Sequence, residues 1–101
     1  MEMNASPELE AWHLYFEGNV QGVGFRYTCR MIAESIGVGG WVRNLSDGRV
    51  ESLITGEPAV LQQFLEQLSG AQAGRIRNIK KSIEAAGPEG WSSEFSILAT
   101  F

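Results

Sequence analysis

The sequence predicts an α+β domain: a ferredoxin-like β-α-β-β-α-β sandwich with a mostly antiparallel sheet, two helices on one face and a short extra C-terminal strand. Two observations predict it. Segments in which apolar residues alternate are interleaved with segments in which they recur every three to four residues. The chain also has 101 residues, 44% of them hydrophobic and 20% charged, which suits one folded domain.

The first strand is expected at residues 11–17, where alternate side chains are apolar. These inward-facing residues are Trp12, Leu14 and Phe16. The preceding segment is polar and contains Pro7, so we expect a flexible tail at residues 1–10 and a single domain at residues 11–101.

The first helix follows a loop with three glycines at residues 18–24. Its apolar residues recur at helical spacing, namely Phe25, Cys29, Ile32 and Ile36. Gly37 stands where glycine commonly ends a helix.

A hairpin is expected next, with strands at residues 38–45 and 49–55 and a Ser-Asp-Gly turn between them. The second helix opens at residues 56–58, with a proline near its first turn, and Gly70 closes it. Its apolar stripe is Leu61, Phe64, Leu65 and Leu68.

Two further strands complete the prediction. Residues 75–84 form the weaker one because Ile76 and Ile79 break strict alternation, and residues 85–93 form a loop. Residues 94–101 alternate again, with Phe95, Ile97, Ala99 and Phe101 on one face. The expected core comprises Trp12, Leu14, Phe16, Ile32, Ile36, Leu61, Phe64, Leu65 and Leu68.

The charge balance argues against a general nucleic-acid binder. The net charge is -4 and the pI is about 4.9, whereas such binders usually have a basic surface and a high pI. Positive charge is nevertheless concentrated locally, because residues 26–49 contain four arginines and only two acids. An anion site is therefore compatible with the acidic composition, although each arginine is also explained as a solvated surface charge.

Cysteine and histidine are equally scarce. Cys29 is the single cysteine, so neither an intramolecular disulfide nor a cysteine-based zinc site can form, and we expect a small buried helix residue there. His13, the single histidine, has the outward parity of the first strand, and the acids show no metal-ligand spacing. We expect no metal and no cofactor. With no signal-peptide pattern and no run of about 20 apolar residues, we expect a soluble cytoplasmic protein that does not enter membranes.

The loop at residues 18–24 is the most informative segment. Its glycines follow G-x-x-x-G-x-G, which is neither a dinucleotide fingerprint nor a Walker A loop. Backbone N–H groups of such a loop and of the following helix turn can converge on a phosphate-sized anion, with Arg26 nearby. A tight turn that needs glycine for conformational reasons explains the spacing equally well.

Two motifs resemble the signatures of the acylphosphatase family. Residues 18–27 read Gly-x-Val-Gln-Gly-Val-Gly-Phe-Arg-Tyr, and residues 40–50 read Gly-Trp-Val-Arg-Asn-x-x-Asp-Gly-x-Val. Their separation also matches the family, and the resemblance extends from about Trp12 to the end of the chain. It implies the same fold and a metal-independent hydrolase that cleaves acyl phosphates to a carboxylate and inorganic phosphate.

The resemblance also implies a site. The catalytic residues of the family correspond to Arg26 and Asn44. Its phosphate-binding segment corresponds to Val20, Gln21, Gly22, Val23, Gly24, Phe25 and Arg26. Inorganic phosphate is expected as product and inhibitor, and the enzyme is expected to act as a monomer without nucleic acid. One departure is Lys81, at a position where the family usually has an inward apolar residue, which leaves the packing of that strand open.

Two alternatives remain at this stage. RNA-recognition domains share this arrangement of sheet and helices, but the acidic pI and the lack of an aromatic and basic signature disfavour that function. Acylphosphatase-like domains also begin the larger hydrogenase-maturation carbamoyltransferases. The absence of zinc motifs and of a transferase region favours a free-standing enzyme.

Overall fold

The computed structural model describes residues 9–22, 24–85 and 93–101. In chain order the elements are β1 (Glu10–Gly18), α1 (Phe25–Ile36), β2 (Gly39–Asn44), β3 (Val50–Gly56), α2 (Pro58–Ala71), β4 (Ile76–Ala85) and β5 (Phe95–Ile97). The predicted tail is one residue too long, because β1 already includes Glu10. Residues 1–8 of that tail and residues 86–92 of the predicted loop lie outside the described residues.

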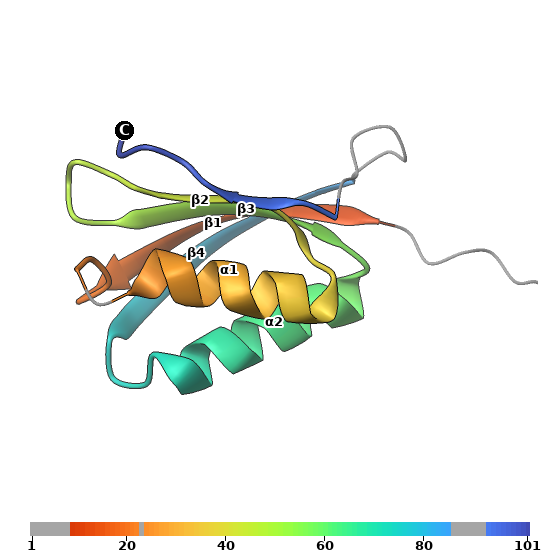
Figure 1. Cartoon of the computed structure of the whole chain (residues 1–101), viewed down its shortest axis with the longest axis horizontal. Coiled ribbons are helices and arrows are strands. Elements are labelled where there is room, and N and C mark those ends of the chain that lie inside the picture. The colour runs from red at the N-terminus through yellow and green to blue at the C-terminus, as the bar shows by residue number, and fades with distance from the viewer. Residues whose placement is uncertain (1–8, 23, 86–92) are drawn as a thin grey trace, which may run out of the picture.

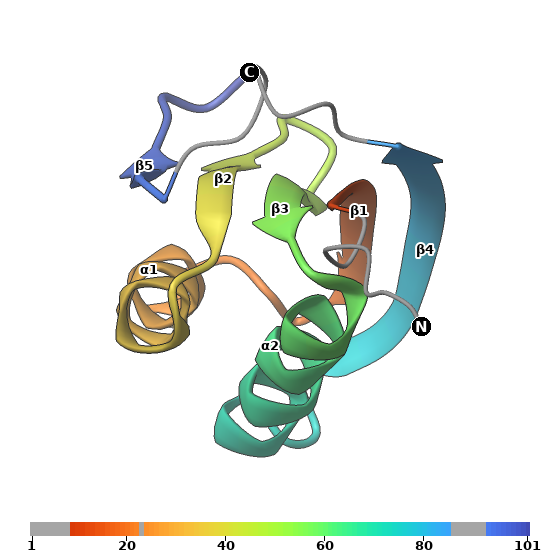
Figure 2. The same ribbon diagram turned by 90° about the vertical axis from the view of Figure 1, so that its right-hand side faces the viewer.

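The strands form one sheet in the order β4-β1-β3-β2-β5. The four longer strands pair antiparallel, and β5 runs parallel to β2. Both helices lie on the same face of the sheet (Figures 1 and 2). There α1 packs under β2 and β5, and α2 contacts β3. The predicted fold class is therefore confirmed.

The core lies between the sheet and the helices. Strand alternation turns Leu14 and Phe16 fully inward. The expected core is confirmed except at Ile32 and Ile36, which are only partly buried. The rotation of α1 buries two members of the predicted stripe, Phe25 and Cys29, together with Ala33.

A β-bulge explains the irregular pattern of β4. Phe16 pairs with Ile79 and Glu17 with Asn78, but Gly18 pairs with Ile76. The register shift leaves Arg77 as an extra residue. Ile76 and Ile79 therefore both pack against the core although they are three positions apart.

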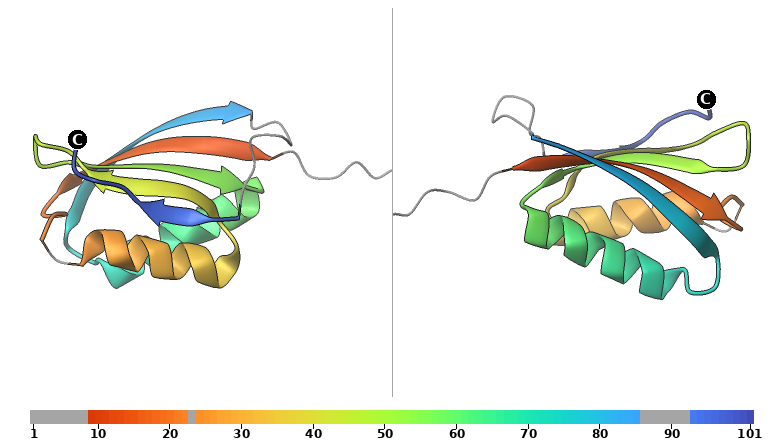
Figure 3. Two further views of the ribbon diagram at one scale, coloured as in Figure 1. Left: turned by 45° about the horizontal axis from the view of Figure 1, so that its top comes forward. Right: turned by 180° about the vertical axis from the view of Figure 1, so that it is seen from behind.

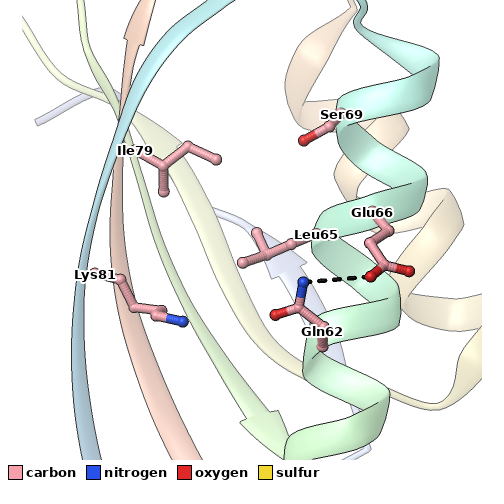
Figure 4. A pocket seen from close by; sticks show the side chains of 6 residues that line it. All are labelled: Gln62, Leu65, Glu66, Ser69, Ile79 and Lys81. Atoms are coloured by element: carbon pink, nitrogen blue, oxygen red, sulfur yellow. Dashed lines mark hydrogen bonds between the residues drawn. The ribbon is translucent and has the colours of Figure 1, made fainter.

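The edge between β4 and α2 contains the departure at Lys81. Lys81 pairs with the inward-facing Leu14, and Figure 4 shows its side chain pointing from β4 toward α2. A cleft of about 520 Å³ lies between these elements. The Lys81 ammonium lies 4.2 Å from the ring centroid of Trp12 and so covers an aromatic ring that is only 4% exposed.

The prediction of a strand over residues 94–101 is too long, because β5 ends at Ile97. The following residues still run beside β2. The Leu98 N–H donates to Val42 O at 2.9 Å, and the Phe101 N–H donates to Asn44 O at 3.0 Å. These spaced bonds hold the C-terminal segment against β2 without a continuous ladder.

The other face of the sheet, here called the open face, is not covered by a helix in the described part of the chain (Figure 3). His13 lies on it, as its strand parity predicted, and is half-buried. No helix of the described residues is long and apolar enough to cross a bilayer.

Candidate active site

Strand directions bring two distant segments together. Both β1 and β2 run antiparallel to β3, so they are parallel to each other and their carboxyl ends share one end of the sheet. The loop after β1 and the hairpin after β2 therefore meet there, as Figure 3 shows in both views.

The base of the loop is anchored to β4. The Asn19 N–H donates to Arg75 O at 2.9 Å. A Cβ atom on Gly18 would collide with the same carbonyl oxygen, so only glycine allows this close approach.

Two loop glycines adopt left-handed backbone conformations. The φ angles are +77° at Gly22 and +73° at Gly24, which explains the requirement for glycine. A Cβ atom at either position would meet no atom within 4 Å. The conformational interpretation of the glycine spacing is therefore confirmed, and the backbone at these two glycines also faces open space.

The amino end of α1 has no acidic side chain that would neutralise its partial positive charge. Its N-cap is Gly24, which forms no side-chain cap hydrogen bond, and its first turn contains no acidic residue. The N–H groups of the first turn have no partner within the helix, and the helix dipole is positive at this end. Such a helix end favours an anion.

Arg26 lies in this first turn and is partly buried. It forms no ion pair or hydrogen bond with another described residue. By contrast, Arg43 and Arg49 are paired with Glu51 and Asp47. The guanidinium of Arg26 is therefore available to an external anion.

Asn44 is the last residue of β2 and shares the inward parity of the fully buried Val42. Its Oδ1 atom is buried and has no hydrogen-bond partner among the described residues. A buried amide oxygen without a partner is unfavourable, so a water or ligand that donates a hydrogen bond would be stabilised there.

One cavity of about 200 Å³ unites these features. Six residues that the sequence predicted for the site line this cavity, namely Val20, Gly22, Gly24, Phe25, Arg26 and Asn44. Gln21 is not among the lining residues, and Val23 lies outside the described residues. Tyr27, next to Arg26, and Ile97 on β5 also line the cavity, and the sequence analysis did not identify either as a site residue. The inward-facing position of Ile97 in the alternating C-terminal segment was the signal that could have identified it.

Among the described residues, no three His, Cys, Asp or Glu side chains are grouped to hold a metal ion. The residues at the cavity instead include loop glycines, the amino end of α1, an arginine and an asparagine. On an α+β sandwich, such groups have the chemistry that suits a phosphate-sized anion.

Comparisons with known proteins agree with this class. A family model described as Acylphosphatase matches residues 12–97. The acylphosphatase of Roseiflexus sp. (strain RS-1) is 40% identical over 87 residues, which cover 85% of this chain and 91% of that protein. The acylphosphatase of Thermotoga maritima is 40% identical over 90 residues, which cover 88% of this chain and 97% of that protein.

A solved structure extends the similarity to three dimensions. The acylphosphatase from Bacillus subtilis gives a TM-score of 0.78 at 33% identity and covers 88% of this chain and 98% of its own. The chain belongs to the acylphosphatase family, the enzymes that hydrolyse acyl phosphates to a carboxylate and inorganic phosphate.

Proposed function

We propose that the cavity at the carboxyl ends of β1 and β2 is the active site for this hydrolysis, with Arg26 and Asn44 as its catalytic residues. One observation supports this most strongly: an arginine and an asparagine line the same small cavity, and within the described part of the chain the arginine has no carboxylate partner and the buried asparagine oxygen has no donor. The first suits the charged phosphoryl group, and the second suits a water molecule.

The phosphoryl group would occupy the cradle, defined as the loop backbone over residues 20–25. N–H groups of the cradle and of the first turn of α1 would donate to its oxygens, and the planar guanidinium of Arg26 would bind two of them. Phosphoryl transfer depends mainly on positioning and charge stabilisation, and donors fixed before the reaction supply both.

Asn44 would orient the attacking water. Its amide offers donors and an acceptor, so it can fix the direction of the water without removing a proton. The carboxylate is a good leaving group, which makes a strong general base unnecessary. A phosphoryl oxygen of the substrate would accept the proton of the water as the P–O bond to the carboxylate breaks.

Several further properties follow from this proposal. Inorganic phosphate would occupy the cradle after the reaction and act as a competitive inhibitor. The proposed reaction uses no metal or cofactor, and one chain supplies every group named above, so we propose that the enzyme acts as a monomer. We also propose that it acts in the cytoplasm.

The direct test is hydrolysis of benzoyl phosphate by the wild type and by Arg26→Ala. We expect kcat/KM to fall by about 100- to 1,000-fold, because a charged donor to the transition state is lost. Arg77→Ala is the matched control, since Arg77 is exposed and does not line the cavity. Circular dichroism should show that both variants fold, and EDTA should not change the wild-type rate. Full activity in folded Arg26→Ala would exclude the proposed site.

A further inference from the structure

The side chain of Gln21 joins the loop to the hairpin that carries Asn44. Its Nε2 atom donates one hydrogen bond to Leu45 O at 2.8 Å and another to Arg49 O at 2.8 Å. Both amide protons are thus used, one on each arm of the hairpin, and the first acceptor belongs to the residue directly after Asn44.

The Gln21 amide supplies both described hydrogen bonds between the loop and the hairpin. Among the described residues, no other hydrogen bond connects the loop at residues 19–24 to the hairpin at residues 44–50. The loop is otherwise attached to β4 through Asn19 and Arg75, on the opposite side of β1 from the hairpin. Val20 and Phe25 anchor this segment in the core, and Gln21 adds its hydrogen-bonded link to the hairpin that carries Asn44.

The hairpin does not need Gln21 for its own closure. Leu45 O also accepts the Gly48 N–H at 3.1 Å, and Arg49 O also accepts the Leu45 N–H at 2.8 Å. Loss of the Gln21 amide leaves neither carbonyl without a partner, so the cost to folding is small. The effect falls mainly on how the loop and the hairpin are placed relative to each other.

We infer that Gln21 is a positioning residue for the reaction: its amide holds the cradle and Asn44 at the separation that in-line attack on the phosphoryl group requires. This inference rests on the proposed function of the cavity. The Gln21 side chain offers no free donor to the substrate, since both Nε2 protons are already used and Gln21 is not among the residues that line the cavity. Small errors in such alignment lower turnover strongly.

The first test replaces Gln21 with methionine, which has a similar length and no donor. We expect kcat for benzoyl phosphate to fall by about 10-fold or more, while the inhibition constant of inorganic phosphate changes by less than about twofold, because the cradle alone binds phosphate. Gln62→Met is the matched control, since the Gln62 amide bonds only to Glu66 on the exposed face of α2. Unchanged kcat in Gln21→Met would overturn the inference.

A double-mutant cycle with Asn44→Ala separates positioning from general stability. If Gln21 acts through Asn44, the loss in kcat caused by Gln21→Met should shrink to less than about twofold in the Asn44→Ala background. An equal loss in both backgrounds would show that Gln21 does not act through Asn44, and would also overturn the inference.

Gln21→Glu gives a second, pH-dependent readout that does not depend on how Gln21→Met folds. An ionised carboxylate would face two carbonyl oxygens without a donor, whereas the protonated form regains one O–H donor. The ratio of variant to wild-type kcat should therefore rise as the pH falls, and a pH-independent ratio would contradict the inference. Failure of the proposed function itself is distinguishable, because folded Arg26→Ala would then keep full activity.

Discussion

At the scale of single residues, Asn44 and Arg26 are distinguished by what each lacks. In the segments that the structure describes, the charge of Arg26 has no counter-charge and the buried acceptor of Asn44 has no donor. A phosphate group can supply the negative charge that Arg26 lacks, and a water molecule can donate the hydrogen bond that Asn44 lacks. Removing either side chain should therefore affect different steps.

We expect Asn44→Ala to lower turnover of benzoyl phosphate by about 100-fold or more while competitive inhibition by phosphate weakens only slightly, because orientation of the water is lost and the cradle remains. Initial rates with and without phosphate measure both quantities. Asn78→Ala is the control, since Asn78 is exposed on β4 and bonds only to Glu17. Equal losses in turnover and in phosphate binding would show that Asn44 binds the anion instead.

Glu51 is the polar centre of the open face. The strand register places it between Tyr15 and Arg43, and it is only 5% exposed. Arg43 Nε donates to its carboxylate at 2.8 Å, and His13 Nε2 lies 2.6 Å from its other oxygen. Burial raises the pKa of this carboxyl, but three side-chain hydrogen bonds outweigh burial and hold the pKa of Glu51 below its usual value.

The lowered pKa of Glu51 predicts acid sensitivity. A carboxyl whose pKa is lower in the folded state stabilises the fold fully above the pKa of the unfolded chain, about 4.3, and loses this contribution as the pH falls through the folded value. In urea unfolding, the free energy of unfolding of the wild type should therefore fall more steeply below about pH 5 than that of Glu51→Gln.

Asp47→Asn is the comparison for this experiment. Hydrogen bonds from Arg49 lower the pKa of Asp47 as well, but this carboxylate is exposed and screened by solvent. Asp47→Asn should therefore change the pH dependence of the free energy of unfolding less than Glu51→Gln does. Identical slopes in the wild type and Glu51→Gln would show that the buried ion pair does not govern acid stability.

At the scale of elements, Lys81 lies at the edge formed by β4 and α2. This side chain lies over Trp12 on the face that the helices cover, where an apolar residue would otherwise be expected. Long basic side chains cover apolar surface with their methylene groups while the charge stays in water. The lysine thus substitutes for an apolar residue at the rim of the cleft in Figure 4.

We expect Lys81→Ala to lower the free energy of unfolding by about 1 kcal/mol, because both the methylene cover and the cation–π contact are lost. Lys81→Met keeps the cover and should recover about half of that loss. Lys80→Ala is the matched control on the open face, where an exposed pair with Glu17 at 3.7 Å contributes less than about 0.5 kcal/mol. Equal values for Lys81→Ala and Lys80→Ala would contradict this account.

At the scale of the whole molecule, the same topology places the site residues at one end of the sheet and buries the core under α1. The crossover from β1 through α1 to β2 brings the two carboxyl ends to the same end of the sheet and presses α1 against β2 and β5. Cys29 is thereby fully buried, and burial raises the pKa of its thiol well above the usual value.

Cys29 therefore reports on opening of the whole fold. We expect no reaction with an aromatic disulfide reagent at neutral pH in the native state, and reaction of one thiol per chain in denaturing urea. The reaction rate should follow the unfolded fraction measured by circular dichroism. Rapid, complete labelling without denaturant would show that α1 opens independently of the rest of the domain.

The sequence by itself determined the features that depend on local order. Alternation placed Leu14 and Phe16 inward, helical spacing placed Leu61 and Leu68 against the sheet, and two motifs singled out Arg26 and Asn44. These predictions succeed because side-chain direction repeats every two residues in a strand and about every 3.6 in a helix. The catalytic roles of the two motif residues remain predictions until the assays above are made.

Only the tertiary structure decided the features that depend on pairing between distant segments. The bulge at Arg77, the short β5, the position of Lys81 over Trp12 and the link from Gln21 to the hairpin all arise where one strand or loop meets another. A local pattern gives the direction of a side chain but not its partner, because the partner is chosen by strand order and register across the sheet.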